Sequence, residues 1–128
     1  MFWRCLLILC CVVIACSACK INLKIRSGTK RPFQVEVAIP SVGKQTEILE
    51  VHRIGVVKRT TVEGKNCNSK PWIIRTYGKK HSDDFEKAHE HKARFDGDGE
   101  VTIIILDDLV PRVTSRDGVA CSETLICG

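Results

Sequence analysis

Apolar and polar residues alternate with a period of two over much of the chain, and this pattern constrains the fold more than any other feature. From Lys20 to Arg26 every second residue is apolar, and Phe33 to Ile39 alternates in the same way. Successive side chains of a β-strand point to opposite faces, so the pattern is typical of a strand buried on one face. Both segments are therefore predicted to be half-buried strands.

A turn is expected between these two strands. Gly28 and Pro32 mark it, because both residue types interrupt regular structure. The two strands would then form an antiparallel hairpin. In that hairpin Glu36 would lie near Lys24, as a cross-strand charge pair.

The segment from Val101 to Leu106 is apolar throughout except for Thr102. A strand with apolar residues on both faces belongs in the middle of a sheet, so Ile103 and Ile105 are predicted to be buried. The four residues Asp96 to Gly99 read Asp-Gly-Asp-Gly and are predicted to form a hairpin turn before this strand.

Weaker strand patterns complete the chain. They cover residues 45–51, 56–62 and 72–77, and the second half of 85–95, where a helix is the competing interpretation. Almost no helix is expected elsewhere. The sequence therefore predicts an all-β fold, a small disulfide-stapled antiparallel β-sandwich of about seven strands, with a small β-barrel as the alternative.

The first 18 residues differ from the rest. Arg4 is followed by an unbroken apolar or small run from Cys5 to Ala18. Such a run is too short to span a bilayer, and with a small residue at its end it is typical of a secretory signal peptide. Residues 1–18 are predicted to be the signal peptide and 19–128 a single secreted domain. Cleavage after Ser17 fits nearly as well, and lipidation at Cys16 is a competing interpretation.

Cleavage would leave four of the eight cysteines in the mature chain. An even number of cysteines in a short exported chain indicates two disulfides. Three connectivities are possible, and a short loop closed by the last two cysteines would leave the first two to pair. The four candidates are Cys19, Cys67, Cys121 and Cys127.

The charge balance is mildly basic, with 20 Lys and Arg against 15 Asp and Glu. The basic residues are scattered along the chain, which argues against a nucleic-acid-binding surface. An extracellular protein or glycan is the expected kind of partner, and no transmembrane segment is expected. We expect no cofactor.

Two histidines form a candidate metal site. His89 and His91 are two residues apart, so on a strand they would project from one face. Two neighbouring imidazoles can share a zinc or copper ion, with His81 or a carboxylate completing the set. The competing interpretation is a polar face of an edge strand.

No catalytic pattern is present. Ser115 lies in a turn-like segment without a glycine-flanked nucleophile, and the mature cysteines are better used in disulfides. Trp72 is expected in the core. The sequence therefore favours a secreted non-enzymatic binding module in the extracellular space, with a carrier of a small apolar ligand or a metal ion as the alternative.

Four short stretches resemble small secreted proteins of nematodes. They are Cys19 to Leu23, Lys70 to Trp72, the Asp-Gly-Asp-Gly segment, and Gly118 to Ser122. The resemblance implies export and a compact fold, and it implies no catalytic or ligand-binding residue.

Overall fold

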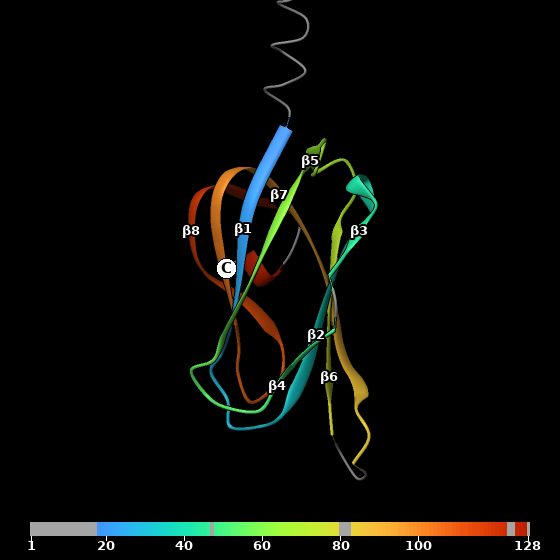
Figure 1. Ribbon diagram of the computed structural model, residues 1–128, viewed down its shortest axis with the longest axis vertical. Helices are drawn as coiled ribbons and strands as arrows, with labels where there is room; N and C mark the ends of the chain where they lie inside the picture. The colour runs from blue at the N-terminus through green and yellow to red at the C-terminus, as the bar shows by residue number, and fades with distance from the viewer. Residues whose placement is uncertain (1–17, 47, 80–82, 123–124, 128) are drawn as a thin grey trace, which may run out of the picture.

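The computed structural model describes residues 18–46, 48–79, 83–122 and 125–127. These residues form strands joined by short turns, with two brief 3₁₀ segments (Figure 1). The strands are β1 (Ala18–Ser27), β2 (Phe33–Ile39), β3 (Lys44–Gln45), β4 (Leu49–Val51), β5 (Val57–Lys65), β6 (Trp72–Gly78), β7 (Glu86–Ile105) and β8 (Pro111–Ser122), and the 3₁₀ segments are η1 (Pro40–Val42) and η2 (Leu125–Cys127). The predicted all-β fold is confirmed.

One long strand, β7, holds the sheet together. The strand order is β3-β2-β6-β7-β1-β5, with β4 pairing to β2 and β8 pairing to β7. The first half of β7 pairs with β6, and its second half pairs with β1 on one side and β8 on the other. The chain therefore forms a single mixed sheet that curls into a half-barrel (Figure 1).

The predicted hairpin between the first two strands is wrong. β1 pairs antiparallel with β5 and parallel with β7, whereas β2 pairs with β6. A parallel pair needs a long crossover connection, and the β2–β6 segment supplies it. The Lys24 ammonium therefore meets Glu100 at 3.3 Å, and Glu36 binds Arg75 instead.

The Asp-Gly-Asp-Gly segment is not a hairpin turn. It lies inside β7, where the register with β8 shifts between Gly97 and Glu100. Gly97 has φ 121°, a conformation that other residues rarely adopt. The backbones of β7 and β8 approach so closely here that a Cβ on Gly99 would overlap the carbonyl oxygen of Asp117. The glycines therefore make a β-bulge, which bends β7.

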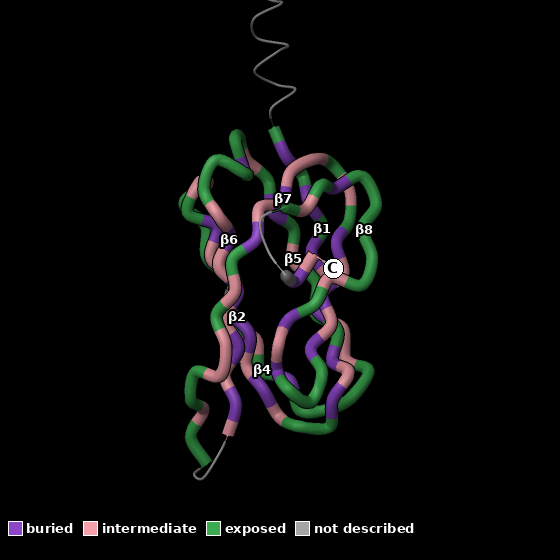
Figure 2. Tube along the Cα trace, turned by 180° about the vertical axis from the view of Figure 1, so that it is seen from behind, coloured by how far each residue is buried: buried purple, intermediate pink, exposed green. Residues whose placement is uncertain are grey.

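The inner faces of the strands form one hydrophobic core. Ile103 and Ile105 are fully buried in it, as predicted, and Trp72 packs there against Phe95 with ring centroids 5.0 Å apart. Buried positions alternate with exposed ones along the tube in Figure 2. Other fully buried large side chains include Phe33, Ile21, Leu23, Ile25, Ile39, Ile74, Leu109 and Val35.

None of the helical segments among the described residues is long and apolar enough to cross a membrane.

Candidate binding surface

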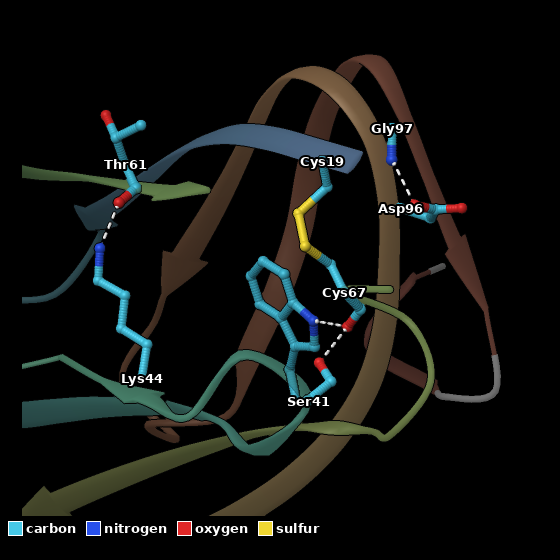
Figure 3. The surroundings of a disulfide bond; sticks show 8 residues. Cys19, Ser41, Lys44, Thr61, Cys67, Asp96 and Gly97 are labelled. Atoms are coloured by element: carbon cyan, nitrogen blue, oxygen red, sulfur yellow. Dashed lines mark hydrogen bonds between the residues drawn. A yellow bond between two sulfur atoms is a disulfide. The ribbon is translucent and has the colours of Figure 1, made fainter. Parts of the chain in front are cut away.

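The disulfide that links the more distant cysteines, with a sequence separation of 48, lies at one end of the half-barrel. Cys19, in β1, bonds to Cys67, and the Cys67 carbonyl accepts hydrogen bonds from the Trp72 indole and the Ser41 hydroxyl, each 2.8 Å long (Figure 3). A second disulfide joins Cys121 to Cys127. The predicted disulfide bonds are confirmed. Of the three possible connectivities, the structure has Cys19 bonded to Cys67 and Cys121 bonded to Cys127.

The two candidate metal-binding histidines lie on β7, opposite strand β6. His89 pairs with Thr76 and His91 with Ile74, and both partners are fully buried. The imidazole centroids are 5.9 Å apart and the rings are tilted by 33°. The histidines therefore share the inner face of the sheet, where each is half-buried.

An ion pair lies near this histidine pair. Arg112 donates to both carboxylate oxygens of Asp108, at 3.1 and 2.7 Å. The pKa of Asp108 lies below its ordinary value, first because of the Arg112 hydrogen bond, then because of the Val110 N–H, with a smaller electrostatic effect of His89. Among the described residues, no three His, Cys, Asp or Glu side chains are grouped to hold a metal ion. Metal binding by His89 and His91 stays a prediction, and His81 lies outside the described residues.

A polar cluster lies on the opposite face of strands β2 and β6. Glu36 is only 6% exposed, although it is charged. Its carboxylate accepts hydrogen bonds from Gln45 at 2.7 Å, Tyr77 at 2.9 Å and Arg75 at 3.1 Å. Arg75 also donates to Glu90 at 2.7 Å. Buried charges are normally paired in this way, so the cluster is explained by its own contacts.

The pKa values in this cluster follow from the same contacts. Burial by itself raises the pKa of Glu36, but hydrogen bonds from Tyr77, Arg75 and Gln45 together outweigh it and lower the pKa. Burial and the nearby Glu36 carboxylate raise the pKa of Tyr77. Glu36 is therefore an anion and Tyr77 a neutral donor at neutral pH.

The two ends of the sheet meet along a seam. One side of the seam is the outer edge of β5, and the other is the edge formed by β3 and β4. At one end the sides touch, because Lys44 donates to the Thr61 carbonyl at 2.7 Å and a Cβ on Gly64 would overlap Val42. The strands β5 and β3 diverge from that end in Figure 1.

An open hollow of about 300 Å³ lies along the seam. Among the described residues that line it, two are cations and none is a carboxylate. Ile48, beside β4, is 54% exposed. The lining residues are Lys44, Gln45, Thr46, Leu49, Arg59 and Thr60.

One side of the β5 backbone faces the seam, and no described strand pairs with it there. The Val56 carbonyl accepts from the Ser27 N–H at 2.9 Å and so faces the β1 side. Backbone groups of successive strand residues point to opposite sides, which turns those of Val57, Arg59 and Thr61 outward. The contact between Lys44 and the Thr61 carbonyl agrees with this assignment.

The seam was not identified from the sequence. Its residues come from two segments that are polar and weakly patterned, and they meet only because the sheet curls. The cations at Lys58 and Arg59, within a predicted strand, were the available signal, since charged residues are common on edge strands.

No family model and no curated protein matches the chain. Among solved structures, the human-specific toxin intermedilysin is similar over 76% of this chain and 23% of its own length, with 12% identity and a TM-score of 0.34. Wild-type pneumolysin is similar over 76% of this chain and 23% of its own length, with 13% identity and a TM-score of 0.34. The chain thus spans about a quarter of the length of these toxins, and the likeness carries no argument about its function.

Proposed function

We propose that this chain is a secreted, non-enzymatic binding module whose extracellular protein partner contacts the seam. The observation that carries the proposal is the open edge of β5 beside a hollow lined by Lys44 and Arg59. Unpaired strand edges are ready templates for another chain, and arginine is favoured at protein interfaces.

Export is supported by the N-terminal sequence and by the disulfides. Disulfides persist in oxidising compartments and are rare in the cytosol. Mass spectrometry of the natively secreted protein would give the cleavage site and the disulfide pairing together. A secreted product that retains Met1 would contradict the proposed signal peptide.

A non-enzymatic role is supported by how the polar groups are used. Glu36, the most buried carboxylate among the described residues, has three hydrogen-bond donors around it, and Asp108 is held by Arg112. No buried side-chain nitrogen or oxygen among the described residues lacks a hydrogen-bond partner. These groups serve the fold, which leaves surface recognition as the better-supported role.

Site-specific crosslinking tests the proposal. A photoreactive amino acid replaces Ile48, at the seam and 54% exposed, or Leu106, which is 37% exposed and lies between β7 and β8, outside the strands that form the seam. Each protein is irradiated in extracellular fluid from its source. We expect a crosslinked protein at position 48, its loss on Arg59→Glu, and no such product at position 106. Equal products at both positions, or none at position 48, would overturn the proposal.

Carriage of a metal ion is the second candidate. The observation that favours it is the pair of imidazoles on one strand, His89 and His91, with centroids 5.9 Å apart. Calorimetry with Zn²⁺ and Cu²⁺ on the wild type and on a His89→Ala, His91→Ala double variant tests it. Binding that is the same in both proteins would exclude these histidines as the site.

A further inference from the structure

We infer that the partner segment at the seam is an extended acidic peptide, which binds as an added strand on the outer edge of β5. This inference rests on the proposed function and names the chemistry of the partner. Addition of a strand to a sheet edge supplies affinity through main-chain hydrogen bonds and specificity through alternate side chains.

Among the edges of the sheet, β5 is the best suited to accept a strand. It is nine residues long, and its register with β1 runs without interruption from Val57 to Lys65. The opposite edge is divided between β3, with two residues, and β4, with three. β8 is longer, but its register with β7 shifts at two places. Short or bulged edges resist pairing, so β5 is the receptive one.

Only part of the β5 edge is accessible. Lys44 already covers the Thr61 carbonyl, and Val42 packs against Gly64. Within the part of the chain that the structure describes, the outward groups of Val57 and Arg59 are clear of both contacts. A short extended segment that pairs with these two residues would form a few backbone hydrogen bonds and lie over the hollow.

The side chains of the hollow define the pattern of the peptide. Thr60 pairs with the buried Leu23, so it lies on the inner face of β5, near the partly buried Leu49. Arg59 pairs with Lys24 and lies on the outer face. Apolar residues of the peptide would contact Leu49 and Thr60, and acidic residues would alternate with them and pair with Arg59. The match is therefore an alternating apolar and acidic strand.

A second copy of this chain is a poor occupant of the same edge. Antiparallel pairing of two accessible β5 segments would set either Lys58 against Lys58 or Arg59 against Arg59, depending on the register. Like charges directly opposite one another destabilise strand pairs. The same cations favour an acidic segment.

A synthetic peptide tests the inference. The probe is a fluorescein-labelled heptapeptide of alternating valine and glutamate, blocked at both ends, and binding to the mature disulfide-bonded protein is followed by fluorescence anisotropy. Its controls are a valine and lysine heptapeptide and a valine and glutamate peptide with alternate backbone nitrogens methylated. We expect saturable binding of the probe, and binding at least about tenfold weaker for both controls, which lack the charge or the backbone donors.

Two variants at position 59 distinguish the contribution of the side-chain charge to peptide binding from that of the backbone N–H. Arg59→Gln removes the cation and keeps the outward N–H, and it should weaken binding about fivefold. Arg59→Pro also removes the N–H, which a proline on an edge strand can do without breaking the β1 pairing, and it should weaken binding about tenfold or more. Hydrogen exchange of the Val57 and Arg59 amides should slow when the probe binds, while that of Thr60 stays unchanged. If Arg59→Pro fails to fold, the methylated peptide and the hydrogen-exchange measurement still test whether the peptide forms backbone hydrogen bonds with β5.

The outcomes distinguish this inference from the proposed function. If the probe does not bind while position 48 still crosslinks a partner, the proposed binding function remains supported and the added-strand inference is wrong. If a heparin fragment displaces the probe and the methylated peptide binds as well as the probe, the seam is a site for polyanions and the inference is also wrong. A dimer of the free protein in sedimentation, dissociated by Arg59→Gln, would assign the edge to a second copy and overturn it too.

Discussion

The indole Nε1 of Trp72 donates a 2.8 Å hydrogen bond to the backbone carbonyl of Cys67. This contact joins the Cys19–Cys67 disulfide to the core, because the Trp72 ring is fully buried and packs edge-on against Phe95. The Ser41 hydroxyl binds the same carbonyl, so η1 is attached there as well. The seam thus starts at the end of the molecule where these contacts join η1 to the disulfide, and where η1 meets β5.

The two disulfides should contribute unequally to stability. Cys19–Cys67 closes a loop with a sequence separation of 48, whereas Cys121–Cys127 has a separation of 6. In the chain-entropy model the longer loop stabilises by about 4 kcal/mol and the shorter by about 2 kcal/mol. Urea denaturation of the Cys19→Ala, Cys67→Ala and the Cys121→Ala, Cys127→Ala double variants compares them. A larger loss from the second pair would contradict the loop-closure explanation.

Truncation in the central strand should cost far more than truncation of the histidine pair. Ile105 is fully buried, so Ile105→Ala should lower the free energy of unfolding by about 2–5 kcal/mol. His89 and His91 are half-buried, and their replacement by Ala should cost about 1 kcal/mol each. Thermal melts with and without a chelator provide the measurement. If the histidines matter more, a melting temperature that falls with chelator identifies a structural metal.

Alternation in the sequence was sufficient to find the strands but not their neighbours. Ile103, Ile105 and Phe33 are buried as predicted, because burial depends on which face of a strand a residue occupies. The alternation predicts that Lys24 lies beside Glu36, yet in the structure Lys24 contacts Glu100 across the parallel pair of β1 and β7. A period of two is the same in parallel and antiparallel strands, so the pattern carries no information about the partner.

The Asp-Gly segment and the seam show two further reasons for failure. Asp-Gly favours backbone conformations that serve hairpin turns and β-bulges equally, so residues around Gly97 were read as a turn although they bend a continuous strand. The seam depends on the curl of the whole sheet, which brings Lys44 to Thr61 across 17 residues. Both the bend in β7 and the seam depend on how strands distant in sequence pack together, so a short window of sequence does not reveal them.

Substitution of the glycines in the bulge should be costly. In Gly99→Ala the new Cβ would overlap the Asp117 carbonyl oxygen, which belongs to the paired backbone of β8 and cannot move freely. We expect a loss of about 3 kcal/mol or more, the upper part of the range for overpacking. Gly55→Ala is the control, because its Cβ would have nothing within 4 Å and only the φ of 85° opposes it, at about 1 kcal/mol. Gly99 itself has no positive φ, so equal losses in chemical denaturation would show that β7 and β8 can move apart to admit the Cβ.

The buried carboxylate of Glu36 should make stability depend on pH. Its pKa is lowered in the folded protein by hydrogen bonds from Tyr77, Arg75 and Gln45, which exceed the opposing effect of burial. A group with a lowered folded pKa stabilises the protein above its unfolded pKa, about 4.3 for glutamate, and this contribution is lost as the pH falls through the folded pKa. Glu36→Gln keeps the shape and removes the charge, so it should cost about 1.5–3 kcal/mol at pH 7.

The difference between wild type and Glu36→Gln isolates this contribution from other carboxylates. Glu90 and Asp108 also have lowered pKa values, so acid should destabilise both proteins through those groups. The difference in melting temperature should be constant from pH 7 to about pH 5 and shrink below that, because protonated Glu36 resembles glutamine in charge. Thermal melts at half-unit pH steps from 7 to 3 provide the measurement. A difference that stays constant down to pH 3 would mean that Glu36 acts through packing and hydrogen-bond geometry, and that its charge contributes nothing to the stability of the β2–β6 pair.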